Sequence, residues 1–214
     1  MTDPKRKYYE KRANVLIKNL HSRHFEACYC ADKAEALKKA LEWIPAGSSV
    51  GWGGAMSAQQ IGLLDTVRTG DYRALDRERV ATPEERKAIM KQCLGADVFI
   101  TGANALSLDG QMVNIDGNGN RVASSLYGHK KVWFIVGRNK LAPTYEEALW
   151  RARNIAAPKN AQRLGRKTPC AVHGDRCYDC KSPERICRAL VVLWERPTGI
   201  GRAEVVLVNE PLGY

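Results

Sequence analysis

The chain has 214 residues, of which 44% are hydrophobic and 27% charged, and its formal net charge at pH 7 is +11. This length supports one domain with a full core, and no apolar run approaches the roughly 20 residues of a membrane span. The charged N-terminus does not resemble a signal peptide, so we expect a cytoplasmic protein. The positive charge favours anionic partners, but no nucleic-acid motif accompanies it, which argues against nucleic acid.

The predicted elements alternate between helices and strands. Apolar periodicity, together with capping boxes at Asp32/Glu35 and Ser57/Gln60 and a helix start at Thr82-Pro83, sets the helix boundaries. We expect helices over residues 4–22, 32–44, 57–70, 82–95, 120–127, 143–156 and 158–164. We expect strands over residues 25–30, 48–52, 72–76, 97–101, 131–136, 189–195 and 203–209.

This alternation indicates an α/β fold with a mostly parallel sheet covered on both faces. We divide a single domain, residues 1–214, into an N-terminal helix (1–22), an α/β core (23–167), a Cys-rich segment (168–188) and a C-terminal antiparallel strand pair (189–214). The final pair is expected at an edge or in a flap.

The segment Thr101–Arg121 concentrates four Gly, four Asn and two Asp directly after the apolar run 98–100. Gly adopts positive φ freely, and Asn and Asp tolerate it, so this density predicts a loop that holds a ligand. Inside the segment, Asp109-Gly110 predicts a hairpin turn. A second Gly-rich turn, Gly51–Ser57, joins a strand to a helix N-terminus, where backbone N–H groups attract anions. Tight strand–helix packing is the alternative explanation of that turn.

Both Gly-rich segments follow strands, and open α/β sheets bind ligands beyond the carboxyl ends of their strands. We therefore expect the two segments to line one ligand cleft. Within it, Arg121 is suited to clamp a carboxylate or phosphate. Asp116 is the candidate general base, with turn capping as its alternative role. The predicted ligand-binding residues are Gly53, Gly54, Ser57, Gln60, Gly102, Asn104, Asn114, Asp116, Gly117, Asn120 and Arg121.

Four cysteines, Cys170, Cys177, Cys180 and Cys187, have the spacing C-x6-C-x2-C-x6-C. Grouped thiolates repel unless a cation binds them, and both iron–sulfur clusters and Zn²⁺ accept four Cys ligands. We favour a [4Fe–4S] cluster because basic residues surround the cysteines, with zinc as the alternative and free thiols as the outcome without a metal. A short helix from Ser182-Pro183 is expected to present Cys187 inward.

Several motifs resemble the LUD (lactate-utilisation) domain family. They include Val50-Gly-Trp-Gly-Gly54, Ile61-Gly-Leu-Leu-Asp65, Asn114-Ile-Asp-Gly-Asn-Gly-Asn-Arg121 and Ser182-Pro-Glu-Arg-Ile-Cys187. The family is related in fold to the ribose-phosphate isomerase and CoA-transferase group, which implies a Rossmann-like three-layer α/β/α sandwich. The resemblance also implies a role in oxidising L-lactate, or a related 2-hydroxy acid, to pyruvate beside iron–sulfur partner subunits.

One departure from the family concerns Gln59-Gln60, where we expect Glu-Glu in relatives. Gln cannot accept a proton, so whether this chain is itself catalytic stays open. The alternative function is a stand-alone binder or enzyme for a small phosphorylated or CoA-like anion. The sequence leaves the oligomeric state open, including a homo-oligomer.

Overall fold

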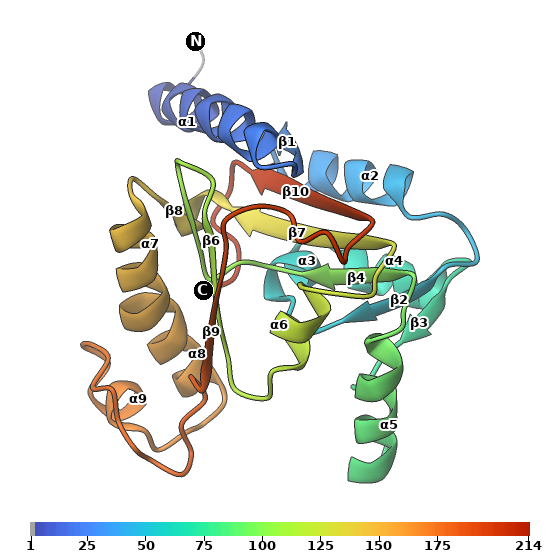
Figure 1. Cartoon of the computed structure of the whole chain (residues 1–214), viewed down its shortest axis with the longest axis vertical. Helices are drawn as coiled ribbons and strands as arrows, with labels where there is room; N and C mark the ends of the chain where they lie inside the picture. The colour runs from blue at the N-terminus through green and yellow to red at the C-terminus, as the bar shows by residue number, and fades with distance from the viewer. Residues whose placement is uncertain (1–2) are drawn as a thin grey trace.

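A six-stranded parallel sheet forms the centre of the computed structural model, which describes residues 3–214 (Figure 1). Every pair of neighbouring strands in it is parallel. In spatial order the strands are β1 (Glu26–Cys30), β10 (Arg202–Val208), β7 (Lys131–Gly137), β4 (Val98–Thr101), β2 (Ser49–Trp52) and β3 (Arg73–Leu75). The predicted mostly parallel sheet is thereby confirmed.

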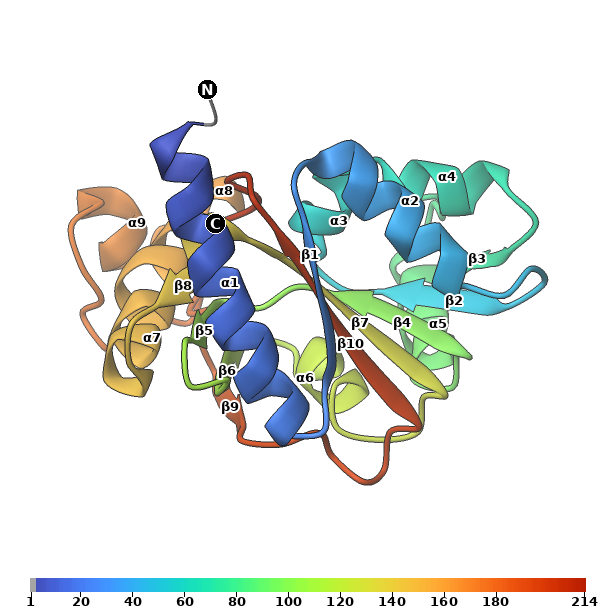
Figure 2. The ribbon, with the colours of Figure 1, turned by 90° about the horizontal axis from the view of Figure 1, so that it is seen from above.

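Helices cover both faces of this sheet (Figure 2). One face packs against α2 (Lys33–Trp43), α3 (Met56–Gln60) and α4 (Leu63–Thr69), with Trp52, Ile100 and Trp133 buried between them. The other face packs against α1 (Pro4–Ser22), α5 (Pro83–Cys93) and a second sheet, around Phe25, Phe99 and Phe134. The result is the expected Rossmann-like three-layer α/β/α arrangement.

The second sheet has four strands, in the order β8 (Leu141–Ala142), β5 (Ala105–Ser107), β6 (Met112–Asp116) and β9 (Ala189–Leu193). The predicted hairpin at Asp109-Gly110 joins β5 to β6, with Gly110 at φ +91°. A helical layer covers its outer face, formed by α7 (Tyr145–Arg151) and the π-helical turn η2 (Ala152–Ala156). The chain continues into α8 (Ala157–Arg163) and α9 (Pro169–His173), while α6 (Asn120–Ser124) and the 3₁₀ turn η1 (Arg138–Lys140) precede this layer.

The two last strands do not pair with each other, so the expected C-terminal antiparallel pair is wrong. β9 joins the second sheet, antiparallel to β6, whereas β10 lies between β1 and β7 in the main sheet. The reason is the apolar run Val205–Val208, which is buried on both faces as a central parallel strand requires.

The predicted helix N-caps formed where the capping side chain has no competing partner from another part of the chain. Thr82 and Glu85 form both hydrogen bonds of a capping box at the start of α5, and Asp32 caps α2. The box predicted at Ser57 and Gln60 is wrong, because α3 begins at Met56 without a side-chain cap and the Ser57 hydroxyl contacts Lys140 instead. The helix expected from Ser182 is also wrong, since only a turn forms at residues 183–184.

No helix within residues 3–214 combines the length and apolar character needed to cross a membrane.

Candidate functional site

A cleft of about 490 Å³ lies at the carboxyl ends of β2, β4 and β7. Both Gly-rich segments line it, as the strand-end argument predicted. The predicted residues that line it are Gly53, Gly54, Ser57, Gly102, Asn104, Asp116, Gly117, Asn120 and Arg121. Gln60 and Asn114 do not line it: Gln60 accepts a hydrogen bond from the backbone N–H of Gly213, and Asn114 is buried behind the loop.

Gly53 allows the two Gly-rich segments to pack closely. A Cβ atom at Gly53 would lie 3.3 Å from the Phe99 ring and 3.4 Å from both Asn120 Nδ2 and Arg121 Cβ. These distances leave no room for a larger side chain without movement of its neighbours. The absence of a side chain here therefore lets the first loop approach the helix start at Asn120.

Arg121 holds the second loop together from inside. Its guanidinium donates to the carbonyl oxygens of Gly102 (3.3 Å) and Ile115 (2.6 Å) and to the side-chain oxygens of Asn104 (3.1 Å) and Asn114 (2.5 Å). Only 14% of the side chain is exposed. The donors predicted to clamp an anion are thus already bonded to the loop, so the structure gives Arg121 a framework role at the cleft wall.

Asp116 caps the turn and the helix that follow it. One carboxylate oxygen accepts from the backbone N–H groups of Asn118 and Gly119, and the other accepts from Val122 at 3.3 Å. These bonds match the turn-capping alternative for Asp116, since each carboxylate oxygen faces the loop's own backbone. Gly119, at φ +83°, is the N-cap residue of α6, and Asn120 is the first residue of this helix.

Lys140 is a cleft residue that the sequence reading missed. It follows β7 in the turn η1, is only 6% exposed, and donates a hydrogen bond to Ser57 Oγ at 3.1 Å. Burial, and then the positive charges of Arg151 and Arg121, lower its pKa to about 7. The signal that would have found it is its place directly after a third buried strand, at the same edge of the sheet.

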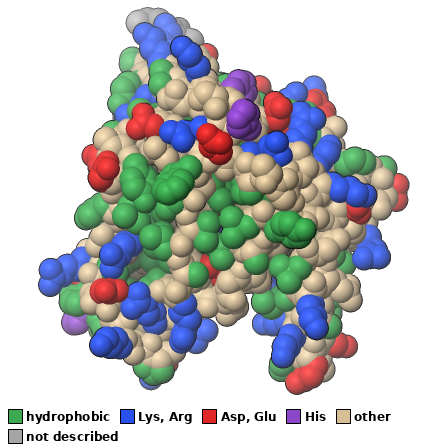
Figure 3. Space-filling model, viewed as in Figure 1, with side chains coloured by type: hydrophobic (Ala, Val, Ile, Leu, Met, Phe, Trp, Pro, Cys, Tyr) green, Lys and Arg blue, Asp and Glu red, His purple; other side chains and the backbone are tan. Residues whose placement is uncertain are grey.

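Positive charge dominates the cleft. Arg151 is buried beside it and donates to the carbonyl oxygens of Asn139 (2.8 Å) and Asn104; burial lowers its pKa to about 10. The cationic lining residues are Arg77, Arg86, Arg121, Lys140, Arg163 and Arg166, against the acidic Glu78 and Asp116. In Figure 3, Lys and Arg side chains gather on α5 and on the lobe that carries α8 and α9, with a notch between them.

The four cysteines of the Cys-rich segment are free thiols in a basic setting. The backbone N–H of Asp179 lies 3.4 Å from Cys177 Sγ, and Arg153 also faces that sulfur. The pKa of Cys187 is raised overall, mainly by burial and also by the charges of Cys177 and Cys180, although Arg185 opposes the rise. The donor chemistry fits a cluster or zinc, but within residues 3–214 no three His, Cys, Asp or Glu side chains are grouped closely enough to hold a metal ion.

The Cys-rich segment lies against the cleft. A Cβ atom at Gly117 would lie 2.7 Å from the carbonyl oxygen of Ile186, and Ile186 itself lines the cleft. The backbone N–H of Arg188 donates to the carbonyl oxygen of Asp116 at 2.9 Å. On the other side, the η2 residue Asn154 accepts a hydrogen bond from the backbone N–H of Cys177. The fold thus places the Cys-rich segment beside the ligand cleft, although the two are distant in sequence.

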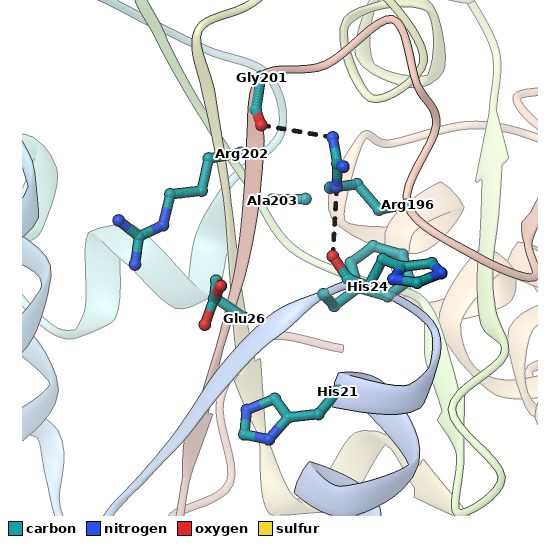
Figure 4. Close-up of a pocket in the computed structure, with 8 residues that line it drawn as sticks. His21, His24, Glu26, Arg196, Gly201, Arg202 and Ala203 are labelled. Carbon is teal, nitrogen blue, oxygen red and sulfur yellow. Dashed lines mark hydrogen bonds between the residues drawn. The ribbon is translucent and has the colours of Figure 1, made fainter.

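A second, more open hollow of about 630 Å³ lies at the amino ends of β1 and β10 (Figure 4). It includes His21, His24 and Glu26, but none of the predicted ligand residues. Arg196 donates there to the carbonyl oxygens of His24 (3.2 Å) and Gly201 (3.3 Å), as Figure 4 shows. Its guanidinium therefore fixes the loop before β10.

Comparison with known proteins agrees with the fold and the motifs. A crystal structure of a DUF162 family protein from Deinococcus radiodurans has a TM-score of 0.52 and 16% sequence identity, and the match covers 95% of this chain and 98% of that one. At this identity the likeness shows the fold alone. No curated protein sequence matches the chain. The family model of the LUD domain matches residues 13–208. The chain therefore belongs to the LUD domain family.

Proposed function

We propose that this LUD domain protein takes part in the oxidation of L-lactate, or a related 2-hydroxy acid, to pyruvate, and that its cleft binds a small anion. Anion binding is supported chiefly by Lys140. This buried amine faces the cleft and forms no salt bridge with any carboxylate in residues 3–214. An unpaired buried cation is costly, and a bound carboxylate or phosphate would offset that cost.

In this proposal the Cys-rich segment binds a [4Fe–4S] cluster through Cys170, Cys177, Cys180 and Cys187, with zinc as the alternative. A bound cluster would supply one-electron transfer to iron–sulfur partner subunits. Support comes from the backbone N–H near Cys177 and from the charges of Arg153 and Arg185, since hydrogen bonds and cations both stabilise thiolate ligands. Because the thiols stand apart, metal loading must draw them together.

The cleft volume favours a second candidate function. About 490 Å³ exceeds the space that a three-carbon acid fills and falls within the range for larger ligands. The exposed guanidinium groups of Arg163 and Arg166 lie on the wall formed by α8 and the residues after it. A phosphorylated or CoA-like anion would use both the volume and these charges.

The anion proposal is tested by thermal unfolding of the full chain with L-lactate, pyruvate, inorganic phosphate or coenzyme A. A ligand at a hundred times its Kd should raise Tm by about 5–10 °C. Arg166→Glu should weaken the effective ligand about tenfold, because it reverses a charge at the cleft, and added salt should do the same.

The matched control is Arg73→Glu, which reverses an exposed charge away from the cleft and should bind like the wild-type chain. Stabilisation by L-lactate and pyruvate supports the first function, and stabilisation by coenzyme A or phosphate alone supports the second. No stabilisation by any of these anions, or equal weakening in both variants, would overturn the cleft assignment.

A further inference from the structure

Lys140 is held in a narrow socket whose walls are mostly backbone. A Cβ atom at Gly213 would lie 3.1 Å from its Nζ atom, and one at Gly102 would lie 3.5 Å away. Ser57 Oγ, itself buried, accepts its hydrogen bond at 3.1 Å. The amine therefore lies at the cleft wall, close to the backbone of two glycines and to the Ser57 hydroxyl.

Burial, and then two neighbouring positive charges, disfavour the protonated form of Lys140 and lower its pKa. The groups that act on it electrostatically are the guanidinium groups of Arg151 and Arg121, and the cleft carboxylate Asp116 faces Arg121 and the loop backbone. With a pKa of about 7, Lys140 is far more often unprotonated at neutral pH than a surface lysine. An ordinary lysine, with a pKa near about 10.4, is almost wholly protonated there and is a poor nucleophile.

We propose that Lys140 is a nucleophile that forms an imine with the carbonyl carbon of an anionic ligand of the 2-oxo acid class. The inference rests on the proposed anion cleft and adds a covalent activity to it. It joins two observations: a socketed amine without a carboxylate partner, and exposed cations of the same cleft, Arg163 and Arg166, that would recognise the ligand's carboxylate.

The reaction needs no oxidant or reductant. The Nζ lone pair forms a bond to the ketone carbon and the carbonyl π electrons move to oxygen; the proton that the nitrogen then releases passes to this oxygen, which gives a neutral carbinolamine. The nitrogen lone pair then expels that hydroxyl as water, with one further proton, and a protonated imine remains. The amine, the carbonyl compound and one proton thus give an iminium ion and one water molecule.

Ser57 is the proton-transfer residue for this step. Its hydroxyl contacts Nζ and lines the same cleft, so it can pass a proton between the amine and the carbinolamine oxygen. Ser57→Ala should keep Lys140 reactive but slow adduct formation about tenfold.

Reductive trapping tests the proposal. The full chain is incubated with pyruvate and sodium cyanoborohydride, and peptide mapping by mass spectrometry locates the carboxyethyl group on lysine. We expect modification of Lys140 at least about tenfold faster than that of any other lysine. The rate should rise as pH increases through about 7, because only the unprotonated amine reacts.

Two variants and one ligand serve as controls. Lys140→Arg keeps the charge and should lose the adduct, whereas Lys130→Arg, at a side chain 80% exposed, should not change it. L-Lactate has no ketone group, so it should bind and compete without forming an adduct. Modification spread evenly over surface lysines would overturn the proposal even if Lys140→Arg fails to fold. Binding of L-lactate without trapping of pyruvate would overturn the imine alone, and loss of both would overturn the cleft as well.

Discussion

At the scale of single residues, burial moves two ionisable side chains toward neutral pH from opposite directions. Lys140 has its pKa lowered to about 7, and Glu204, in the central strand β10, has its pKa raised to about 7. Neither position is conspicuous in the sequence, because a lone Lys or Glu is usually exposed. Burial is set by tertiary packing, so the sequence reading missed both.

Glu204 predicts a pH dependence of stability. Its side chain is 0% exposed, and this burial is the main reason why its pKa is raised. The positive charges of Arg202 (2.8 Å away), Lys131 and Lys39 oppose the rise, and the negative charge of Glu26 adds to it. The folded state therefore retains a proton that the unfolded chain releases between pH 4.5 and about 7. The free energy of unfolding should fall by up to about 3 kcal/mol as pH rises through this window.

Glu204→Gln should remove most of this slope, because Gln does not titrate. Urea unfolding at several pH values between about 4.5 and 7.5 measures it. Glu195→Gln changes an exposed carboxyl and should retain the wild-type slope. An identical slope in the wild-type chain and Glu204→Gln would show that Glu204 does not cause the dependence.

At the scale of elements, signals contained within one element were predictable and signals that depend on a neighbour were not. The capping box of α5 needs only residues three apart, and it formed as expected. Ser57 has the same sequence pattern, but a contact with Lys140, far along the chain, replaced the cap. The second Gly-rich loop was placed correctly at the cleft, whereas the bonding of Arg121 inside it depended on acceptors from two segments, one before β5 and one in β6.

Arg121→Ala separates the framework role from the clamp role. Removal of the guanidinium breaks its hydrogen bonds to the oxygens of Gly102, Asn104 and Ile115, which should cost about 2–4 kcal/mol of unfolding free energy. Arg166→Ala, at an exposed position on the same cleft, should change stability by less than about 0.5 kcal/mol. If Arg121→Ala keeps its stability yet loses anion binding, the clamp predicted from the sequence is right.

At the scale of the whole molecule, strand alternation was enough to predict a parallel sheet and a cleft at its carboxyl edge. It could not assign β9 and β10, because both are apolar strands and only their partners distinguish a mixed sheet from a parallel one. The cysteines posed the same problem. Their spacing indicates a shared ligand, but their position beside the cleft follows from the pairing of β9 with β6.

The cluster prediction concerns the whole chain, purified anaerobically. We expect iron and sulfide at roughly four per chain, with visible absorbance from thiolate-ligated iron. Cys177→Ser should lose most of the iron, and Cys28→Ser, outside the Cys-rich segment, should retain it. Zinc in place of iron would select the alternative metal, and a chain that binds neither would refute metal binding by the segment.

The contact between Gly117 and Ile186 ties the energetics of the two regions together. If closing the thiols around a metal shifts this backbone, it must also change how tightly the cleft holds its anion. Free energy depends only on the states and not on the order of binding. The factor by which the metal alters anion affinity must therefore equal the factor by which the anion alters metal affinity. The anion affinity of the cleft would then depend on whether the four cysteines hold a metal.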